Sequence, residues 1–107
     1  MDCLLGIDVG TSSLKSLLMS VDGTILAEAA KEYHFDVPMT GYAEQDPSVW
    51  WEALKETVRQ VFNQASVSGS QVKGVGFSGQ MHGLVALDKD FKPLRKAILH
   101  CDVRSQK

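Results

Sequence analysis

The chain has 107 residues, enough for one small domain, and 44% of them are hydrophobic, which excludes wholesale disorder. The formal net charge is −2 with acidic and basic side chains interspersed, so no basic patch supports a nucleic-acid surface. Cys3 and Cys101 lack metal-site spacing, and neither a basic secretory leader nor an apolar run of membrane length is present, so we expect a cytoplasmic protein with unpaired thiols.

The first part of the chain predicts three strands joined by short links. Residues 3–9 are almost uninterrupted apolar residues, which is typical of a central strand covered on both faces. Residues 14–21 predict a second strand, and the hairpin dipeptide Asp22-Gly23 leads into a third over residues 24–33. Links this short predict an antiparallel meander.

A helix is expected after the loop at residues 37–45. Asp46-Pro47 is a start signal, because Asp can accept a backbone N–H at the N-cap and Pro has no N–H to leave unpaired. One apolar stripe follows at helical spacing, and Ser-Gly-Ser at residues 68–70 ends the helix. The stripe consists of Trp50, Leu54, Val58, Val61, Phe62 and Ala65.

The β-rich residues 72–78 follow this helix, so we expect a strand that joins the sheet in parallel. Residues 84–87 and 94–99 predict two more short strands around a turn at residues 88–90. The order of three strands, helix and strand predicts an α/β fold, the front half of a ribonuclease-H-like unit. Further helices and strands would complete that unit, so we expect an incomplete domain.

The turn after the first strand is the first candidate site. Its backbone N–H groups and the hydroxyls of Thr11 and Ser12 could approach phosphate oxygens, because Gly10 leaves room for a ligand. Asp8 would repel a phosphate directly, so it fits a role with Mg²⁺, and Lys15 adds positive charge. The ending of a Walker loop is absent. An ordinary polar turn is the alternative interpretation.

The second candidate site is the segment over residues 77–83, just beyond a predicted parallel strand, where ligands of α/β sheets bind. Gln80 and His82 can hydrogen-bond hydroxyl groups, and Met81 offers an adaptable apolar wall. A sugar or polyol is therefore an expected ligand. Gly79 and Gly83 would let the ligand come close.

Other interpretations of this segment stay open. Met81 could belong to the core, with His82 an ordinary surface histidine. A hydrolase triad of Ser78, His82 and Asp102 is formally possible but lacks a nucleophile-elbow context. Asp102 and Arg104 could form a surface ion pair of little energetic weight.

Four segments resemble known families. Asp-x-Gly-Thr-x-x-x-Lys at residues 8–15 resembles the first phosphate loop of the actin, Hsp70 and sugar kinase superfamily. Ser-Gly-Gln-Met-His-Gly at residues 78–83 resembles the sugar-binding segment of the xylulose kinases within the FGGY carbohydrate kinase family. Residues 41–47, followed by two tryptophans expected to pack in the core, resemble that family's helix entry. Residues 97–104 resemble its Leu-Trp-x-Asp-x-Arg stretch, with His100 where Trp is usual.

The resemblance implies an ATP-dependent kinase that phosphorylates a ketopentose, D-xylulose foremost, with ATP and Mg²⁺ as cofactors. It implies that one set of residues positions phosphate and metal and another contacts the sugar. The first set is Asp8, Gly10, Thr11, Ser12 and Lys15, and the second is Gln80, Met81, His82 and Asp102.

In this family the catalytic base and the adenine site lie further along than Lys107. We therefore expect these 107 residues to be the first part of the first kinase domain, inactive by themselves and prone to self-associate through an exposed sheet edge. Another sugar or polyol kinase of the family, or a non-catalytic sugar-binding module of the same fold, are the alternatives. An actin-like or Hsp70-like ATPase would leave the segment at residues 78–83 unexplained.

Overall fold

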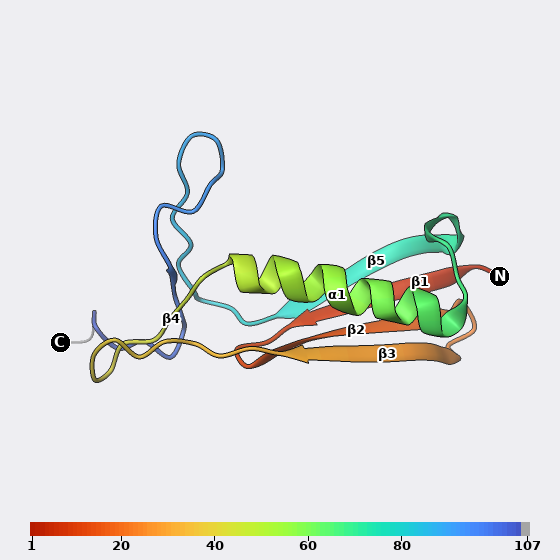
Figure 1. The fold of residues 1–107 in the computed structure, drawn as a ribbon, viewed down its shortest axis with the longest axis horizontal. Helices are drawn as coiled ribbons and strands as arrows, with labels where there is room; N and C mark the ends of the chain where they lie inside the picture. Colours follow the sequence, from red (N-terminus) through yellow and green to blue (C-terminus); the bar gives the residue numbers. More distant parts are fainter. Residues whose placement is uncertain (106–107) are drawn as a thin grey trace.

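A computed structural model describes residues 1–105 as a four-stranded sheet with one long helix on one face (Figure 1). The strands lie in the order β3-β2-β1-β5. β1 (Cys3–Val9), β2 (Ser13–Ser20) and β3 (Ile25–Glu32) are antiparallel, and β5 (Val72–Gly79) pairs with β1 in parallel. The meander and the parallel crossover predicted from the sequence are both confirmed.

The β2–β3 hairpin turns at the predicted dipeptide. Gly23 has a φ of 96°, a left-handed conformation that glycine adopts without strain. The carboxylate of Asp22 accepts the N–H of Thr24 at 3.0 Å and also the hydroxyl proton of Ser20. These hydrogen bonds lower the pKa of Asp22, the bond from Ser20 most of all. Local side-chain chemistry therefore closes this turn.

Helix α1 (Ser48–Ala65) begins one residue later than expected. It ends before the predicted stop at residues 68–70, because Ser66, which follows it, has a left-handed φ of 54°. The N-cap is Pro47 and not Asp46 as predicted, but the Asp46 carboxylate still accepts the N–H of Ser48 at 2.9 Å, and this bond lowers its pKa. Within residues 1–105, no helix has both the length and the apolar character that crossing a membrane requires.

The core lies between α1 and the sheet. The helix buries Ala53, Thr57 and Val61. Of the expected apolar stripe only Val61 is fully buried, and its other members are partly buried against the core. A hydrogen bond of 2.8 Å joins the buried hydroxyls of Ser16 and Thr57, so β2 and α1 share a polar contact inside the core. The strand residues that complete the core are Cys3, Leu5, Ile7, Leu14, Leu18 and Ala27.

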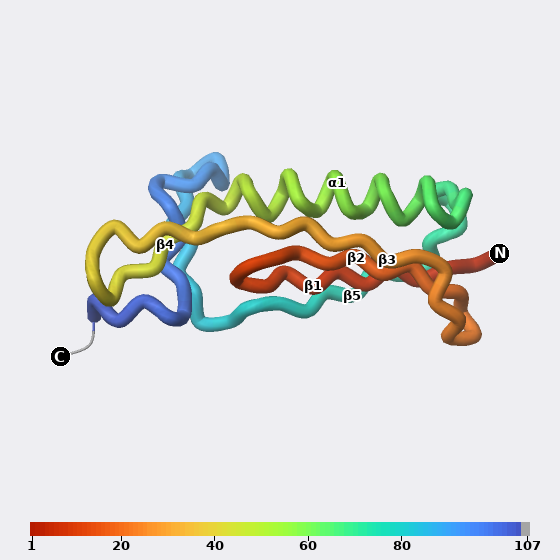
Figure 2. The backbone as a smooth tube through the Cα atoms, turned by 60° about the horizontal axis from the view of Figure 1, so that its bottom comes forward, coloured from red at the N-terminus to blue at the C-terminus, as the bar shows by residue number. Residues whose placement is uncertain are grey.

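The opposite face of the sheet carries no helix in the described residues (Figure 2). α1 packs against β2 and β3, so the edge strand β5 is uncovered even on the helix side. Val75 and Phe77 pair in register with Leu5 and Ile7, yet they are 52% and 69% exposed. An apolar edge strand is therefore open to solvent.

The predicted strands at residues 84–87 and 94–99 are wrong in most of their extent. Only β6 (Ala97–Ile98) forms, and it pairs with β4 (Glu44–Gln45), a two-residue strand that the sequence did not indicate. Residues 84–87 make single bridges, from Leu84 to Ile98 and from Leu87 to Pro93. The turn predicted at residues 88–90 does form, because the Asp88 carboxylate accepts two N–H groups that follow it.

Candidate functional site

The turn that links β1 to β2 is tight and needs a glycine. The N–H of Gly10 donates to the carbonyl oxygen of Ser13 at 2.9 Å. A Cβ at Gly10 would lie 2.9 Å from that same oxygen, closer than real Cβ contacts come. The turn could therefore not keep this shape with a larger residue at position 10.

The carbonyl oxygens of this turn accept hydrogen bonds from other residues of the chain, whereas two of its N–H groups have no such partner in the described part of the chain. Gly10 O accepts the hydroxyl of Tyr33 at 2.5 Å, Thr11 O accepts Gln45 Nε2 at 3.2 Å, and Ser12 O accepts the N–H of Tyr33 at 3.0 Å. No hydrogen bond within residues 1–105 uses the N–H of Thr11 or Ser12. Successive unpaired N–H groups are suited to binding an anion such as phosphate.

Asp8 and Lys15 lie directly opposite each other on β1 and β2, and both are exposed. The described residues hold no group of three or more His, Cys, Asp or Glu side chains that could bind a metal by themselves. Protein Mg²⁺ sites often use one or two carboxylates, with phosphate oxygens and water as the other ligands. Asp8 near unpaired N–H groups therefore fits Mg²⁺ that is bound together with a phosphate group.

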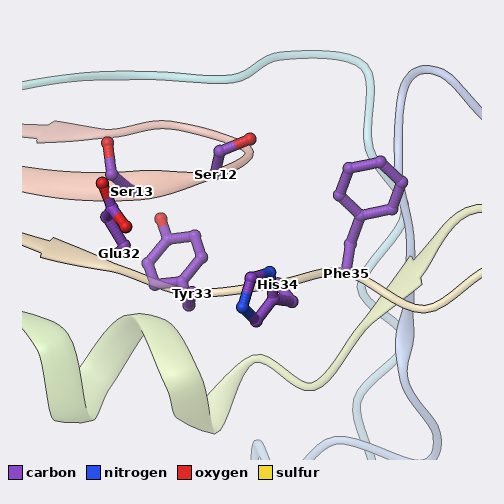
Figure 3. A pocket seen from close by; sticks show the side chains of 6 residues that line it. All are labelled: Ser12, Ser13, Glu32, Tyr33, His34 and Phe35. Atoms are coloured by element: carbon purple, nitrogen blue, oxygen red, sulfur yellow. The ribbon is translucent and has the colours of Figure 1, made fainter.

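Tyr33 holds the turn from the end of β3. Burial, and to a smaller extent the negative charge of Asp8, raise the pKa of Tyr33 to about 12. The hydroxyl therefore stays protonated at physiological pH and donates to Gly10 O. A pocket of about 380 Å³ lies beside it (Figure 3), and Glu32 in its wall makes this side of the turn unfavourable for phosphate. Its lining residues are Ser12, Ser13, Glu32, Tyr33, His34 and Phe35.

Gln80 joins the second candidate segment to the turn. Its N–H donates to Val9 O at 2.9 Å, its Nε2 lies 3.5 Å from Gly10 O, and its Oε1 accepts the Thr11 hydroxyl at 3.3 Å. The preceding residue permits this approach, since a Cβ at Gly79 would lie 2.8 Å from Val9 O. The structure thus brings together the two segments that the sequence singled out separately.

A second pocket, of about 210 Å³, opens beside Gln80 and His82. His82 has a left-handed φ of 65°, which is uncommon for a residue with a side chain. Two polar side chains among apolar walls suit a small ligand with several hydroxyl groups. Met81 does not line this pocket and is 71% exposed. The lining residues are Val9, Trp50, Gln80, His82, Gly83, Val85, Ala97 and Leu99.

Asp102 is engaged by the protein itself. Its carboxylate accepts the N–H of Ala43 at 2.7 Å and the guanidinium of Arg104 at 2.6 and 2.9 Å, and these contacts hold its pKa far below the usual range, the bonds from Arg104 most of all. Arg104 also binds Glu44 and stacks on the ring of Tyr42, 3.9 Å from its centroid. The side chain of Asp102 is only 1% exposed, so its contribution in this structure is to anchor residues 97–104.

Nothing in the local sequence marks Tyr33 or Gln45 as a site residue, and the helical spacing of Trp50 predicts a core position alone. Gln45 is 1% exposed, and its Nε2 donates to Thr11 O and His34 O while its Oε1 accepts Trp50 Nε1 at 2.6 Å. Trp50 packs against the core as expected and also lines the second pocket, whereas Trp51, expected in the core as well, is 59% exposed. A buried glutamine is unusual unless its hydrogen bonds are satisfied, but burial cannot be read from the local sequence.

Comparison with known proteins gives a family match over residues 3–107, to the N-terminal domain of the FGGY family of carbohydrate kinases. A xylulose kinase from Lactococcus lactis is 46% identical over 107 residues, which is 100% of this chain and 21% of the relative. The structure of a xyloylose kinase from Brucella ovis superposes with a TM-score of 0.91 at 36% identity, over 96% of this chain and 22% of that one. A gluconate kinase from Lactobacillus acidophilus gives 0.86 at 28%, over 95% and 20%.

These relatives are much longer than the present chain, which spans about a fifth of the length of the curated proteins it matches. Their folds agree with the ribonuclease-H-like α/β class predicted from the sequence. The names of these relatives differ in the sugar, so the names alone do not define a substrate for this chain.

Proposed function

Because this chain belongs to the FGGY family of carbohydrate kinases, we propose that the protein carrying it transfers the γ-phosphate of ATP to a ketopentose, D-xylulose foremost. The observation that carries the proposal is the joining of Gln80 to three consecutive residues that end β1 and begin the turn. A kinase must hold a phosphate and an acceptor hydroxyl side by side. Here the candidate segments for these two tasks are hydrogen-bonded to each other.

The phosphate end of the site consists of Gly10, Thr11 and Ser12, with Asp8 and Lys15 on the adjoining strands. The unpaired N–H groups would bind phosphate oxygens, and Lys15 would add positive charge. Asp8 would hold Mg²⁺, directly or through water. When bound, Mg²⁺ offsets the charge that develops between the β- and γ-phosphates.

The sugar end consists of Gln80, His82 and Met81. Gln80 and His82 line the same small pocket, where amide and imidazole groups can orient hydroxyls. Met81 does not line that pocket, but its exposed side chain would offer an apolar contact to a sugar that extends beyond it. Asp102 would act on the sugar through the segment it anchors.

In the proposed reaction a sugar hydroxyl oxygen forms a new bond to the γ-phosphorus, the bond to ADP breaks, and the hydroxyl proton passes to a base. We place that base and the adenine site outside these 107 residues, so the chain alone should not turn over. Three of the acidic residues in its turns and caps, Asp22, Asp46 and Asp88, are engaged in local hydrogen bonds.

A coupled assay of ADP release tests the activity. The complete gene product should release ADP with D-xylulose faster than with gluconate or glycerol, and the 107-residue chain should release none. Turnover by the 107-residue chain would refute its proposed inactivity. A preference for gluconate or glycerol would support the proposed kinase activity but refute D-xylulose as the preferred substrate. Sugar binding without ADP release by the complete product would favour a non-catalytic module.

We also propose that the 107-residue chain self-associates through β5. Val75 and Phe77 are exposed, and the outer edge of β5 has no strand partner within residues 1–105. An apolar strand edge of this kind pairs readily with another chain.

A further inference from the structure

One hydroxyl connects three segments of the site that are far apart in the sequence. His100 Nε2, in the segment after β6, lies 3.1 Å from Thr11 Oγ1 in the turn. The same oxygen lies 3.3 Å from Gln80 Oε1, in the loop after β5. We propose that His100 is a positioning residue: it donates a hydrogen bond to Thr11, and Thr11 thereby orients Gln80 in the sugar pocket. This inference rests on the proposed kinase function.

The direction of the first hydrogen bond follows from the amide of Gln80. Its Nε2 is turned toward Gly10 O, which can only accept, so its Oε1 is the atom that faces Thr11. The reversed amide would place two carbonyl oxygens against each other. Thr11 must therefore donate its single hydroxyl proton to Gln80.

The direction of the second bond follows from the first. Because the proton of the Thr11 hydroxyl is already committed, Thr11 Oγ1 can only accept from His100, and Nε2 of His100 must carry a proton. The neutral Nε2–H tautomer and the doubly protonated ring both satisfy this requirement. The relay from His100 to Thr11 to Gln80 is therefore independent of the charge on His100.

Losing this relay should affect the binding of the sugar more than the binding of the nucleotide. Gln80 lines the sugar pocket, whereas the turn offers phosphate its backbone N–H groups, which the relay does not use. Without a donor at position 100, the Thr11 hydroxyl is free to rotate and Gln80 loses its fixed orientation. His100 should thus influence the KM for the sugar and leave the KM for ATP unchanged.

Steady-state kinetics on the complete gene product test this, with the sugar that it phosphorylates fastest. His100→Phe removes the donor, and we expect the KM for the sugar to rise about 3- to 10-fold, the range of a single net hydrogen bond. His100→Gln keeps an N–H donor at a similar reach and should restore the KM to within about 2-fold. Cys101→Ser, a change at the neighbouring exposed residue, serves as the control. Equal effects of Phe and Gln would overturn the proposal.

A double mutant isolates the relay from a general packing effect. If His100 acts through Thr11, then His100→Phe should have no further effect once Thr11→Val has removed the hydroxyl. Additive losses in the double mutant would mean that His100 works by another route, and the proposal would fail.

A measurement without turnover separates this inference from the proposed function. In protein labelled with ¹⁵N-histidine, the Nε2 resonance of His100, assigned by its loss in His100→Gln, should be that of a protonated nitrogen and should shift in Thr11→Val. If the complete gene product is inactive but His100 gives this resonance, the kinase proposal is refuted and the proposed hydrogen bonds from His100 to Thr11 to Gln80 are supported. An unprotonated Nε2, or one that does not respond to Thr11→Val, would refute the relay whatever the activity.

Discussion

The hydroxyl of Tyr33 donates a hydrogen bond of 2.5 Å to the carbonyl oxygen of Gly10, so the end of β3 holds the turn between β1 and β2. Tyr33 is 9% exposed, and Asp8 at the end of β1 contributes to its raised pKa. A carbonyl held in this way points into the protein. The N–H groups of the next two residues are then left for a ligand.

This relationship predicts a loss of stability in alkali. The pKa of Tyr33 is about 12 in the folded chain, above the ordinary value near 10 that applies to the unfolded chain. Its contribution to stability is therefore complete below pH ~10 and is lost as the pH rises toward ~12, because only the unfolded chain ionises in that window. The free energy of unfolding of the chain, measured by urea titration at several pH values, should fall more steeply than that of Tyr33→Phe. Parallel pH profiles would contradict the raised pKa.

The contact of Gly79 with Val9 predicts an unequal pair of glycine substitutions. A Cβ at Gly79 would lie 2.8 Å from Val9 O, so Gly79→Ala must push β5 away from β1 and should cost about 1–3 kcal/mol of unfolding free energy. Gly76 lies in the same strand with nothing within 4 Å of an added Cβ, so Gly76→Ala should change stability by less than about 0.5 kcal/mol or raise it. Urea unfolding of both variants measures the difference, and similar losses would refute the steric argument.

Local chemistry explains which parts of this fold could be predicted from the sequence. Residues 3–9 are a strand because of their apolar run, and the hairpin follows from the left-handed φ that Gly23 tolerates. The failures occur where distant residues decide. β4 is two residues long and exists because Glu44 and Gln45 meet Ala97 and Ile98. No periodicity marks a strand of that length.

The candidate site shows the same division. Asp8, the glycine turn and Gln80 were identified because their residue types and spacing carry a chemical meaning. The sequence did not predict the roles of Tyr33 and Gln45. Both residues hold the turn through hydrogen bonds to backbone oxygens, and these bonds depend on the folded geometry. His100 stood out only as a departure from a familiar pattern, and its contact with Thr11 appears when the chain is folded.

The contacts of Asp102 predict that the chain loses stability in acid. The hydrogen bonds from Arg104 hold the pKa of Asp102 far below its ordinary range near 4, so the stability that it contributes is present above pH ~4 and is lost as the pH falls toward the folded-state pKa. Asp102→Asn should therefore lower stability at pH 7 and flatten the decline below pH 4. Unfolding midpoints between pH 2 and pH 7 test this. Asp2→Asn is the matched control, and an equally flattened profile there would contradict the assignment to Asp102.

Asp8 predicts a metal-dependent nucleotide affinity. If its carboxylate holds Mg²⁺ beside the turn, Asp8→Asn should weaken the binding of ADP about 10-fold in Mg²⁺, as expected for losing one charged ligand. In EDTA no Mg²⁺ is available, so the only remaining effect of the Asp8 carboxylate is its repulsion of the phosphate. The same substitution should therefore change the affinity for ADP little. Calorimetric titration of the complete gene product in both buffers gives the comparison. Equal losses with and without Mg²⁺ would place Asp8 in a structural role.

The open edge of β5 predicts that the 107-residue chain associates in a manner that depends on Val75 and Phe77. Both are more than half exposed, and both lie on a strand with an unpaired side, so two copies can bury apolar area and add backbone hydrogen bonds at once. Replacing both by Thr introduces a β-branched residue that a strand favours and lowers the apolar area. Sedimentation velocity should show concentration-dependent species for the original chain and mainly monomer for the double variant. Val21→Thr, at an equally exposed position beside the hairpin turn, should leave association unchanged, and a loss there as large as in the double variant would mean that the contact does not lie on β5.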